Sequence, residues 1–560
     1  MSRRVETRAP TRVGKANGHR PDGAPADAAP KQRIGARAFV RRERSAQRRQ
    51  AARRAKLASS RSGTFASLLE FHVGGSLVRA VRRIPTAALV CVLVAFLNAA
   101  CWSIVSPPFE VPDEPSHFAY VKQLAETGSL PRSASGSYSY EELAALQALR
   151  YYKVREQPDN RTIASRHEQA ALEHVLRTAP GVSEKGSRAA GVAASEPPLY
   201  YALETIPYAL GKGGTLLTRL QLMRLTSALL AGLTALFAFL FLREALPREP
   251  WAWTVGGLAV ALTPLLGFMS GAVNPDSLLF AVASAVFYCL ARAFRRGLST
   301  GGATALGALL AIGFLTKLNF IGLVPGIVLG LVVLCARAAR VSGRSAYRLL
   351  ALALAIGFSP VALYVLVNVL SNHAALGAAS AVTVDARRSI LGEIDYIWQL
   401  YLPRIPGTAS YFPGIFPAQK LWFDGYVGLY GWLDTTFPGW VYSVALIPAG
   451  AIAALCARAL YQARAQLRRR AVELGVYAAV SVGLLVLVGA ASYDRFPVAD
   501  AEFAQTRYLL PLIALFGAVL ALAARGAGRR WGPVVGTLLV VLFLGHDVFS
   551  QLLVAGRFYG

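Results

Sequence analysis

The chain has 560 residues, of which 54% are hydrophobic and 16% charged, and its net charge is +28. Soluble proteins carry about a quarter of their residues as charges, so these values exclude an ordinary soluble globular protein. Long apolar runs recur along the chain, which indicates that lipid is the solvent for most of it. The cysteines lie in or at the ends of these runs, which excludes a disulfide framework or a zinc motif and favours buried packing: Cys91, Cys101, Cys289, Cys335 and Cys456.

Residues 1–84 form a basic segment that precedes the first apolar run. Positions 1–83 hold 21 Lys and Arg against 5 Asp and Glu, together with many Ala, Gly, Ser and Pro residues. We interpret this segment as a disordered cytoplasmic tail that contacts anionic membrane lipids. Neither interleaved aromatic residues nor a binding fold accompanies the charge, so we do not expect nucleic acid as a partner.

Residues 85–560 are predicted to form an all-α, polytopic transmembrane domain with about eleven membrane-spanning helices. The predicted spans are 86–106, 221–243, 253–272, 275–292, 303–317, 320–337, 347–370, 437–460, 471–491, 506–525 and 532–554. The run 303–337 is interrupted by Lys317 and Asn319, and a bent hairpin is an alternative there.

Charge asymmetry between the connections predicts the orientation. With the tail inside, the inner connections are basic: Arg243–Arg248, Arg292–Arg296, Arg337–Arg348, Arg458–Arg470 and Arg525–Arg530. This pattern predicts a plasma-membrane protein with a cytoplasmic N-terminus and an outer-face C-terminus. A further span at 199–210 would invert every later connection, so we expect an amphipathic piece lying on the surface there.

Two outer-face segments are long, residues 107–220 and 371–436, and long ordered loops often carry function. The first contains predicted helical stretches at Tyr140–Tyr152 and Ser165–Leu176. The second is rich in aromatic residues. These rings either anchor the loop at the headgroups or stack on a sugar.

The most informative motif follows the first span, where Asp113, Glu114 and His117 lie among the prolines of segment 107–118. A carboxylate at the membrane surface is well placed to take a proton from a hydroxyl while the other reactant stays in lipid. Alternatives are that Asp113 caps the following helix and that His117 is a packed ring. Capping and catalysis are compatible for Asp113.

Other polar residues are predicted at the same membrane depth, where ionisable groups are costly and mark candidate functional sites. They are Glu196, Tyr200, Tyr201, Arg224, Asp276, Lys317 and Arg507. Lys317 and Arg507 have snorkelling as an alternative, and Glu196 has support of the Pro-Pro turn. For Asp276 we favour a cap on a helix that begins at Ser277. A divalent cation, Mg²⁺ or Mn²⁺, is left open because three acidic residues share this face.

In chain order, these motifs resemble the GT-C superfamily of integral-membrane glycosyltransferases. The resemblance covers residues 86–525 and rests on Asp113-Glu114, Pro197–Tyr201, Arg224–Ser227, Asn274–Asp276, Thr316-Lys317, Gly431–Thr435 and Gln505–Pro511. Within the superfamily these motifs look like an uncharacterised bacterial branch described only as predicted membrane proteins.

The resemblance implies an inverting enzyme that takes a sugar from a polyprenyl-phosphate donor on the outer face and passes it to a glycan, lipid or protein acceptor. Carried over, Asp113 is the base with Glu114 and His117 beside it. Lys317, Arg507 and Arg224 hold the donor phosphate. The acceptor or sugar contacts fall on Glu196, Tyr200, Tyr201, Asp276, Trp432 and Asp434.

Three alternatives remain from the sequence. A polymerase or ligase of lipid-linked glycans would also suit the aromatic second loop. A transporter or flippase of lipid-linked sugars should place its charges near mid-membrane, whereas here they are predicted at the outer rim. A structural scaffold would not need clustered charges on one face. No nucleotide-binding P-loop, GxSxG or HExxH motif is present to support a pump or hydrolase.

Overall fold

The computed structural model describes residues 84–131, 138–157, 159–163, 165–178, 191–342, 345–371, 375–376, 389–494 and 504–560. Pro85–Gly560 forms one compact unit. The predicted tail, residues 1–84, lies outside the described residues except for Ile84.

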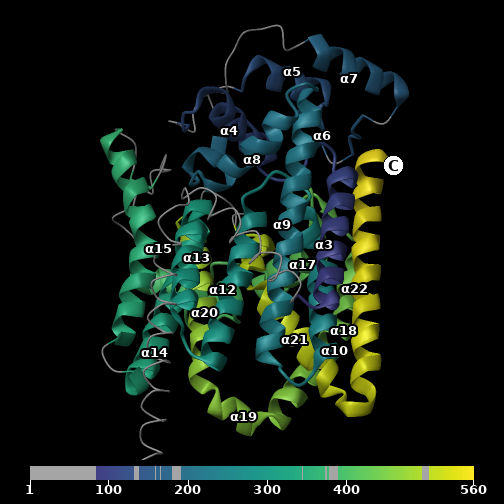
Figure 1. Cartoon of the computed structure of the whole chain (residues 1–560). Helices are drawn as coiled ribbons and strands as arrows, with labels where there is room; N and C mark the ends of the chain where they lie inside the picture. The colour runs from purple at the N-terminus through teal and green to yellow at the C-terminus, as the bar shows by residue number, and fades with distance from the viewer. Residues whose placement is uncertain are drawn as a thin grey trace, which may run out of the picture. The chain divides into compact units, whose positions relative to one another are not determined.

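A helical bundle makes up most of this unit (Figure 1). Within the described residues, nine helices are long and apolar enough to cross a membrane. They are α3 (Thr86–Val105), α9 (Leu216–Ala245), α12 (Asp276–Arg296), η3 with α14 (Leu318–Leu323, Val324–Ser342), α15 (Ser345–Leu370), α18 (Gly439–Gln462), α20 (Ala471–Tyr493), η5 with α21 (Thr506–Leu512, Ile513–Gly526) and α22 (Gly528–Tyr559).

Two further predicted spans take other forms. The stretch 253–272 is a bent pair, α10 (Pro250–Ala261) and α11 (Pro264–Ser270), with an angle of 54° between them. Pro264 explains the bend because proline lacks the N–H that would continue the helix. The fifth predicted span is α13 (Thr300–Thr316), an apolar helix of only 17 residues. The structure thus supports nine spans, or ten with the bent pair, and the count of eleven stays a prediction.

The first long loop gathers at one end of the bundle, which we call the loop end (Figure 1). Its helices are α4 (Glu114–Thr127), α5 (Tyr140–Ala148), α6 (Tyr151–Glu156), α7 (Arg166–Thr178), η2 (Gly191–Ser195) and α8 (Leu199–Leu210). The stretch predicted at Ser165–Leu176 corresponds to α7, whereas the one predicted at Tyr140–Tyr152 is divided between α5 and α6. The short basic helix α19 (Arg464–Arg469) lies at the opposite end of the bundle.

The second long loop holds α16 (Ile390–Tyr401), η4 (Ala418–Phe423), α17 (Asp424–Gly428) and a small hairpin. In the hairpin, β1 (Leu429–Tyr430) pairs antiparallel with β2 (Thr435–Thr436). The turn between them needs positive φ at Gly431 (59°) and at Leu433 (67°). The hairpin packs inward, because Tyr430 is buried against Trp102 of α3 and Phe268 of α11.

Large apolar side chains on several long helices are exposed, for example Leu363 at 61% and Ile447 at 72%. Such faces suit contact with acyl chains, where burial in protein is not required. The buried apolar core runs instead through α9, α12, α13, α20 and α21. The bundle thus has a protein-packed centre, and its polar site lies at the loop end.

Candidate functional site

Asp113, the predicted base, and Arg507, a predicted phosphate ligand, form an ion pair although 394 positions separate them in the chain. Nη2 of Arg507, in the first turn of η5, donates to Oδ2 of Asp113 at 2.9 Å. The Arg507 side chain is 6% exposed and that of Asp113 is 26% exposed. The Nε and Nη1 groups of Arg507 are buried and have no hydrogen-bond partner among the described residues. This arginine therefore keeps donor capacity for an anion.

A strained turn directs the Asp113 carboxylate toward Arg507. Asp113 is the residue before α4 and has φ 68° and ψ 0°, a left-handed conformation that costs free energy outside glycine. Its side chain makes no capping hydrogen bond, so the capping alternative is not observed. Burial alone would raise the pKa of Asp113, but the opposing charge of Arg507 holds that pKa below its usual value. The carboxylate is therefore ionised at neutral pH.

A second ion pair, between Asp276 and Lys317, belongs to the same cluster. Nζ of Lys317 lies 2.8 Å from Oδ1 of Asp276, and both side chains are buried. Lys317 occupies the extended break between α13 and η3. Glu196 joins them, since its Oε2 accepts the backbone N–H of Leu318 at 3.2 Å. Burial raises the pKa of Glu196, and Lys317 opposes this shift.

The interpretation of Asp276 as a helix cap is wrong. Helix α12 begins at Asp276 itself, and Oδ1 of Asn274 accepts the Asp276 backbone N–H at 3.0 Å. The Asp276 carboxylate does not cap the helix, and its Oδ1 pairs with Lys317. Its Oδ2 is buried without a hydrogen-bond partner in the described part of the chain.

The structure places Glu114 and Arg224 in a saturated buried pair instead of facing a pocket. Glu114 accepts from Nε and Nη2 of Arg224 at 2.7 and 2.6 Å, and from the backbone N–H groups of Phe109 and Val273. Arg224 also donates to the carbonyls of Ser103, Ser106 and Pro107. These bonds use all five N–H groups of the guanidinium. Neither residue has spare capacity for a substrate, in contrast to the roles expected from the sequence.

Three of the predicted site residues lie in the packing of helices α4 and α8: His117, Tyr200 and Tyr201. Nδ1 of His117 lies 2.9 Å from the Tyr201 hydroxyl, and burial lowers the His117 pKa to about 3, so its imidazole is neutral. The Tyr201 ring stacks on Tyr120 at 3.8 Å between centroids. The Tyr200 hydroxyl lies 2.7 Å from Oγ of Ser227. Both tyrosines are fully buried, which places them in the packing of α4, α8 and α9.

Trp432 and Asp434 lie on the hairpin turn and meet residues that the sequence reasoning did not select. Oδ2 of Asp434 accepts from Nη2 of Arg557 at 3.0 Å. The Arg155 guanidinium lies 3.9 Å from the centroid of the Trp432 ring. Glu110 is 3% exposed, and burial, reinforced by Asp434, raises its pKa to about 8. Arg557 could have been found as a charge at the C-terminal end of the last span, and Glu110 as a third carboxylate in the 107–118 motif.

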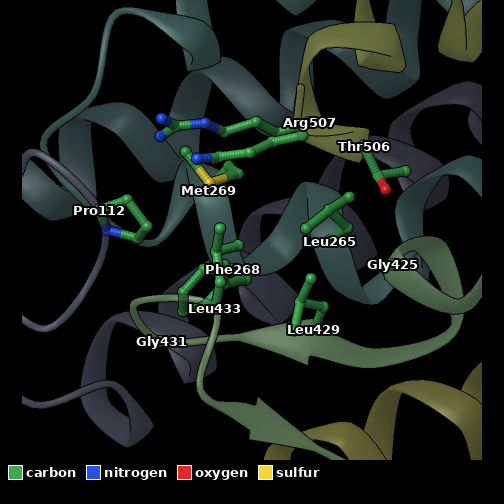
Figure 2. Close-up of a pocket in the computed structure, with 11 residues that line it drawn as sticks. Pro112, Leu265, Phe268, Met269, Gly425, Leu429, Gly431, Leu433, Thr506 and Arg507 are labelled. Atoms are coloured by element: carbon green, nitrogen blue, oxygen red, sulfur yellow. The ribbon is translucent and has the colours of Figure 1, made fainter. Parts of the chain in front are cut away.

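A pocket lies beside the Asp113–Arg507 pair (Figure 2). Figure 2 shows the Arg507 side chain extending across this pocket toward Pro112. An apolar groove, formed by η4, α17, η5 and α21, is lined by Trp422, Phe423, Tyr426, Leu509, Ile513, Phe516 and Val519, among others. Thr506 lines both the pocket and the groove, so the two meet at this residue.

The acidic residues do not fit a divalent cation. Among the described residues, no group of three or more His, Cys, Asp or Glu side chains could hold a metal ion. Asp113 and Asp276 are each paired with a cationic side chain, and Glu114 is saturated. We therefore derive no step through Mg²⁺ or Mn²⁺.

Residues 96–516 match a family model described as "Predicted membrane protein (DUF2142)". The chain belongs to the DUF2142 family. Together with its apolar helices, this makes it a multi-pass membrane protein. No curated protein matches this DUF2142 chain. Among solved structures it is similar to the oligosaccharyltransferase of Archaeoglobus fulgidus in the apo form, with 12% identity and a TM-score of 0.39. That match covers 84% of this chain and 56% of the other, so this chain spans just over half the length of that protein.

Proposed function

We propose that this DUF2142 protein is a glycosyltransferase of the GT-C type that acts on the outer face of the plasma membrane. It moves a sugar from a polyprenyl-phosphate donor to a hydroxyl of a glycan, lipid or protein acceptor, with inversion at the anomeric carbon. One observation carries the proposal: the ionised Asp113 is paired with Arg507, and the pocket that Arg507 lines meets an apolar groove at Thr506. One carboxylate, nearby cations and an apolar groove are the parts that this reaction needs.

The donor lies with its lipid chain in the apolar groove and its phosphate at Arg507. The groove follows the candidate span 506–526 from Thr506 to Val519, so a prenyl chain in it stays within the lipid layer. The two unpartnered guanidinium nitrogens of Arg507, Nε and Nη1, suit two phosphate oxygens, since arginine binds phosphate in a bidentate manner. The charge of Lys317 also acts on Asp113, which indicates that this second cation is close enough to share the phosphate charge.

In the reaction, Asp113 takes the proton of the acceptor hydroxyl as its oxygen attacks the anomeric carbon from the side opposite the phosphate. The new C–O bond forms, the bond between the anomeric carbon and the phosphate oxygen breaks, and polyprenyl phosphate leaves with the electron pair. Arg507 and Lys317 stabilise the charge that develops on the departing phosphate. No nucleotide is needed, because the sugar is already activated by its phosphate.

Donor binding also makes Asp113 a better base. In the free protein the Arg507 charge lowers the pKa of Asp113. When a phosphate shares that charge, the carboxylate loses part of its stabilisation and its proton affinity rises. Glu114 and Arg224 hold the loop that presents Asp113, while His117 supports it as a neutral, buried ring.

The test uses purified protein in nanodiscs with a panel of polyprenyl-phosphate sugars. We expect donor turnover by the wild type and its loss in Asp113→Asn, with donor binding and thermal stability retained. Asp159→Asn, at an exposed position of the same loop, is the matched control and should keep wild-type activity. Absence of turnover with every donor, alongside movement of lipid-linked sugar across a proteoliposome membrane, would refute the enzyme and support the transporter.

A further inference from the structure

A second polar cluster lies where the first long loop, the hairpin turn and the end of α22 come together. We call it the Glu110 cluster, and it consists of Glu110, Trp432, Asp434 and Arg557. Arg557 is its centre, because Nη2 bonds Asp434 at 3.0 Å and the carbonyl of Val154 at 3.0 Å. Its Nη1 bonds the carbonyl of Asn160 at 2.7 Å. The backbone N–H of Trp432 in turn donates to Oδ1 of Asp434 at 3.1 Å.

Two donors of this cluster are buried without a hydrogen-bond partner in the described part of the chain. They are Nε of Arg557, whose side chain is 8% exposed, and Nε1 of Trp432. Glu110, also in the cluster, is 3% exposed. Buried polar atoms are nearly always hydrogen-bonded, so unpartnered donors on two separate segments need an explanation. A ligand with several hydroxyl groups supplies both donors and acceptors.

The Glu110 cluster adjoins the pocket of the Asp113–Arg507 pair. Glu110 is three residues before Asp113, and Pro112 between them lines that pocket. Gly431 and Leu433, on either side of Trp432, line it as well (Figure 2). In the view of Figure 2 these residues lie on the left, and Thr506, where the apolar groove begins, lies on the right. The pocket that Arg507 lines therefore meets the groove at Thr506 and is also bordered by chain neighbours of the cluster residues.

The charges of the cluster favour a neutral ligand. Asp434 is neutralised by Arg557, and the charges of Asp434, Arg557 and Arg155 act on Glu110. The raised pKa of Glu110 keeps its carboxyl group neutral at pH 7. A hydroxyl can donate to a carboxyl oxygen and accept from a guanidinium or indole N–H, whereas a phosphate or carboxylate could use only the donors. We propose that the Glu110 cluster binds the hydroxyl groups of a carbohydrate acceptor. Its role as the acceptor subsite rests on the proposed glycosyl transfer, but its capacity to bind carbohydrate does not.

The test measures carbohydrate binding without any donor. Full-length protein in nanodiscs is probed by saturation-transfer difference NMR with the methyl glycosides of arabinose, mannose, glucose and galactose. We expect at least one glycoside to bind the wild type. Trp432→Phe removes the indole N–H and keeps an aromatic ring, and Glu110→Leu removes the carboxyl group. Each should weaken binding about ten-fold, as expected for loss of one buried hydrogen bond that the ligand completes.

The matched control is Trp531→Phe, since Trp531 is 58% exposed at the opposite end of α22. It should leave glycoside binding unchanged. The proposal is overturned if no glycoside binds, or if binding survives in both cluster variants while their thermal stability matches the wild type. A separate donor-hydrolysis assay, run without glycoside, distinguishes the two failures. If the wild type binds a glycoside but turns over no donor, the proposed function is refuted. If it turns over a donor but binds no glycoside, the role of the Glu110 cluster is refuted.

Discussion

Glu114→Gln tests whether the carboxylate next to the proposed base is structural or substrate-facing. All four hydrogen bonds to Glu114 come from donors: two from Arg224 and one each from the backbone of Phe109 and Val273. A glutamine keeps the shape but presents an NH₂ group to at least one donor that needs an acceptor. It also leaves Arg224, 2% exposed, as a buried charge without its counter-ion. Breaking a buried ion pair in this way costs about 3–5 kcal/mol.

The assay is unfolding of the purified protein in mixed micelles, with the free energy compared between variants. Glu114→Gln should lose about 3–5 kcal/mol. Glu173→Gln is the matched control, because the ion pair between Glu173 and Arg177 is on the surface. That pair should contribute at most about 1 kcal/mol to the free energy of unfolding. Adding Arg224→Met to Glu114→Gln should recover part of the loss, since the unpaired charge is then removed. This double-mutant cycle isolates the energy of the pair.

One result would refute this reasoning. If Glu114→Gln unfolds like the wild type but abolishes donor turnover, then Glu114 acts on the substrate and the saturated pair is not its function. The same outcome would restore the role that the sequence motif suggested for this residue.

Three further predictions follow from the pocket and the cluster. Arg507→Lys keeps the charge but loses the fork of N–H groups, so kcat/KM for the donor should fall roughly 100-fold in a turnover assay, and a wild-type value would contradict phosphate binding there. Gly425→Ala should raise the KM for long-chain donors, because its Cβ would clash with Oγ1 of Thr506 at the junction of pocket and groove. Gly439→Ala meets no atom within 4 Å and should change nothing. The raised pKa of Glu110, about 8, means that the folded protein binds one more proton than the unfolded chain between roughly pH 4.5 and 8, so stability falls as pH rises through this window. Thermal midpoints measured from pH 5 to 9 should fall less steeply in Glu110→Gln than in the wild type, and equal slopes would contradict the raised pKa of Glu110. That pKa is raised by burial and modified by the charges of Asp434, Arg557, Glu114 and Arg155.

Much of the helical framework could be predicted from the sequence because hydropathy is a local property. The runs at 86–106, 347–370 and 471–491 correspond closely to α3, α15 and α20. The bend in 253–272 could also have been predicted, because Pro264 stands inside that run. What the sequence could not supply was how the polar loops fold back on the bundle. The hairpin at 429–436, for example, depends on packing against Trp102 and Phe268, which are far from it in sequence.

The candidate site was predictable as a set of residues but not as a set of pairs. Membrane depth alone grouped Asp113 with Arg507, although 394 positions separate them in the chain. Which of two adjacent carboxylates pairs with Arg507 depends on the left-handed backbone at Asp113, and no sequence signal reveals that angle. The same limit explains the error at Asp276, since Asn274 and Asp276 are both good helix-starting residues and only the structure shows which one receives the N–H. Arg557 and Glu110 were missed because their roles arise from contacts between distant segments.

The Asp113–Arg507 pair leads to a prediction about pH that separates base catalysis from a structural salt bridge. The cations whose charges act on Asp113 are Arg507 and Lys317, whereas the nearby His117 is neutral. In the free protein these cations keep the Asp113 pKa below its usual value. The apparent pKa on the acid side of the kcat/KM profile should therefore lie below the pKa of an ordinary aspartate. In the donor complex the phosphate takes up the charge of Arg507, so the acid limb of kcat should lie at higher pH. Removing the cation with Arg507→Gln should raise the apparent pKa of the kcat/KM profile toward that of the kcat profile, because the Asp113 carboxylate then lacks its partner in the free protein. A pair that only holds the loop in place would give coincident limbs in the wild type, and that result would contradict the assignment of Asp113 as the base.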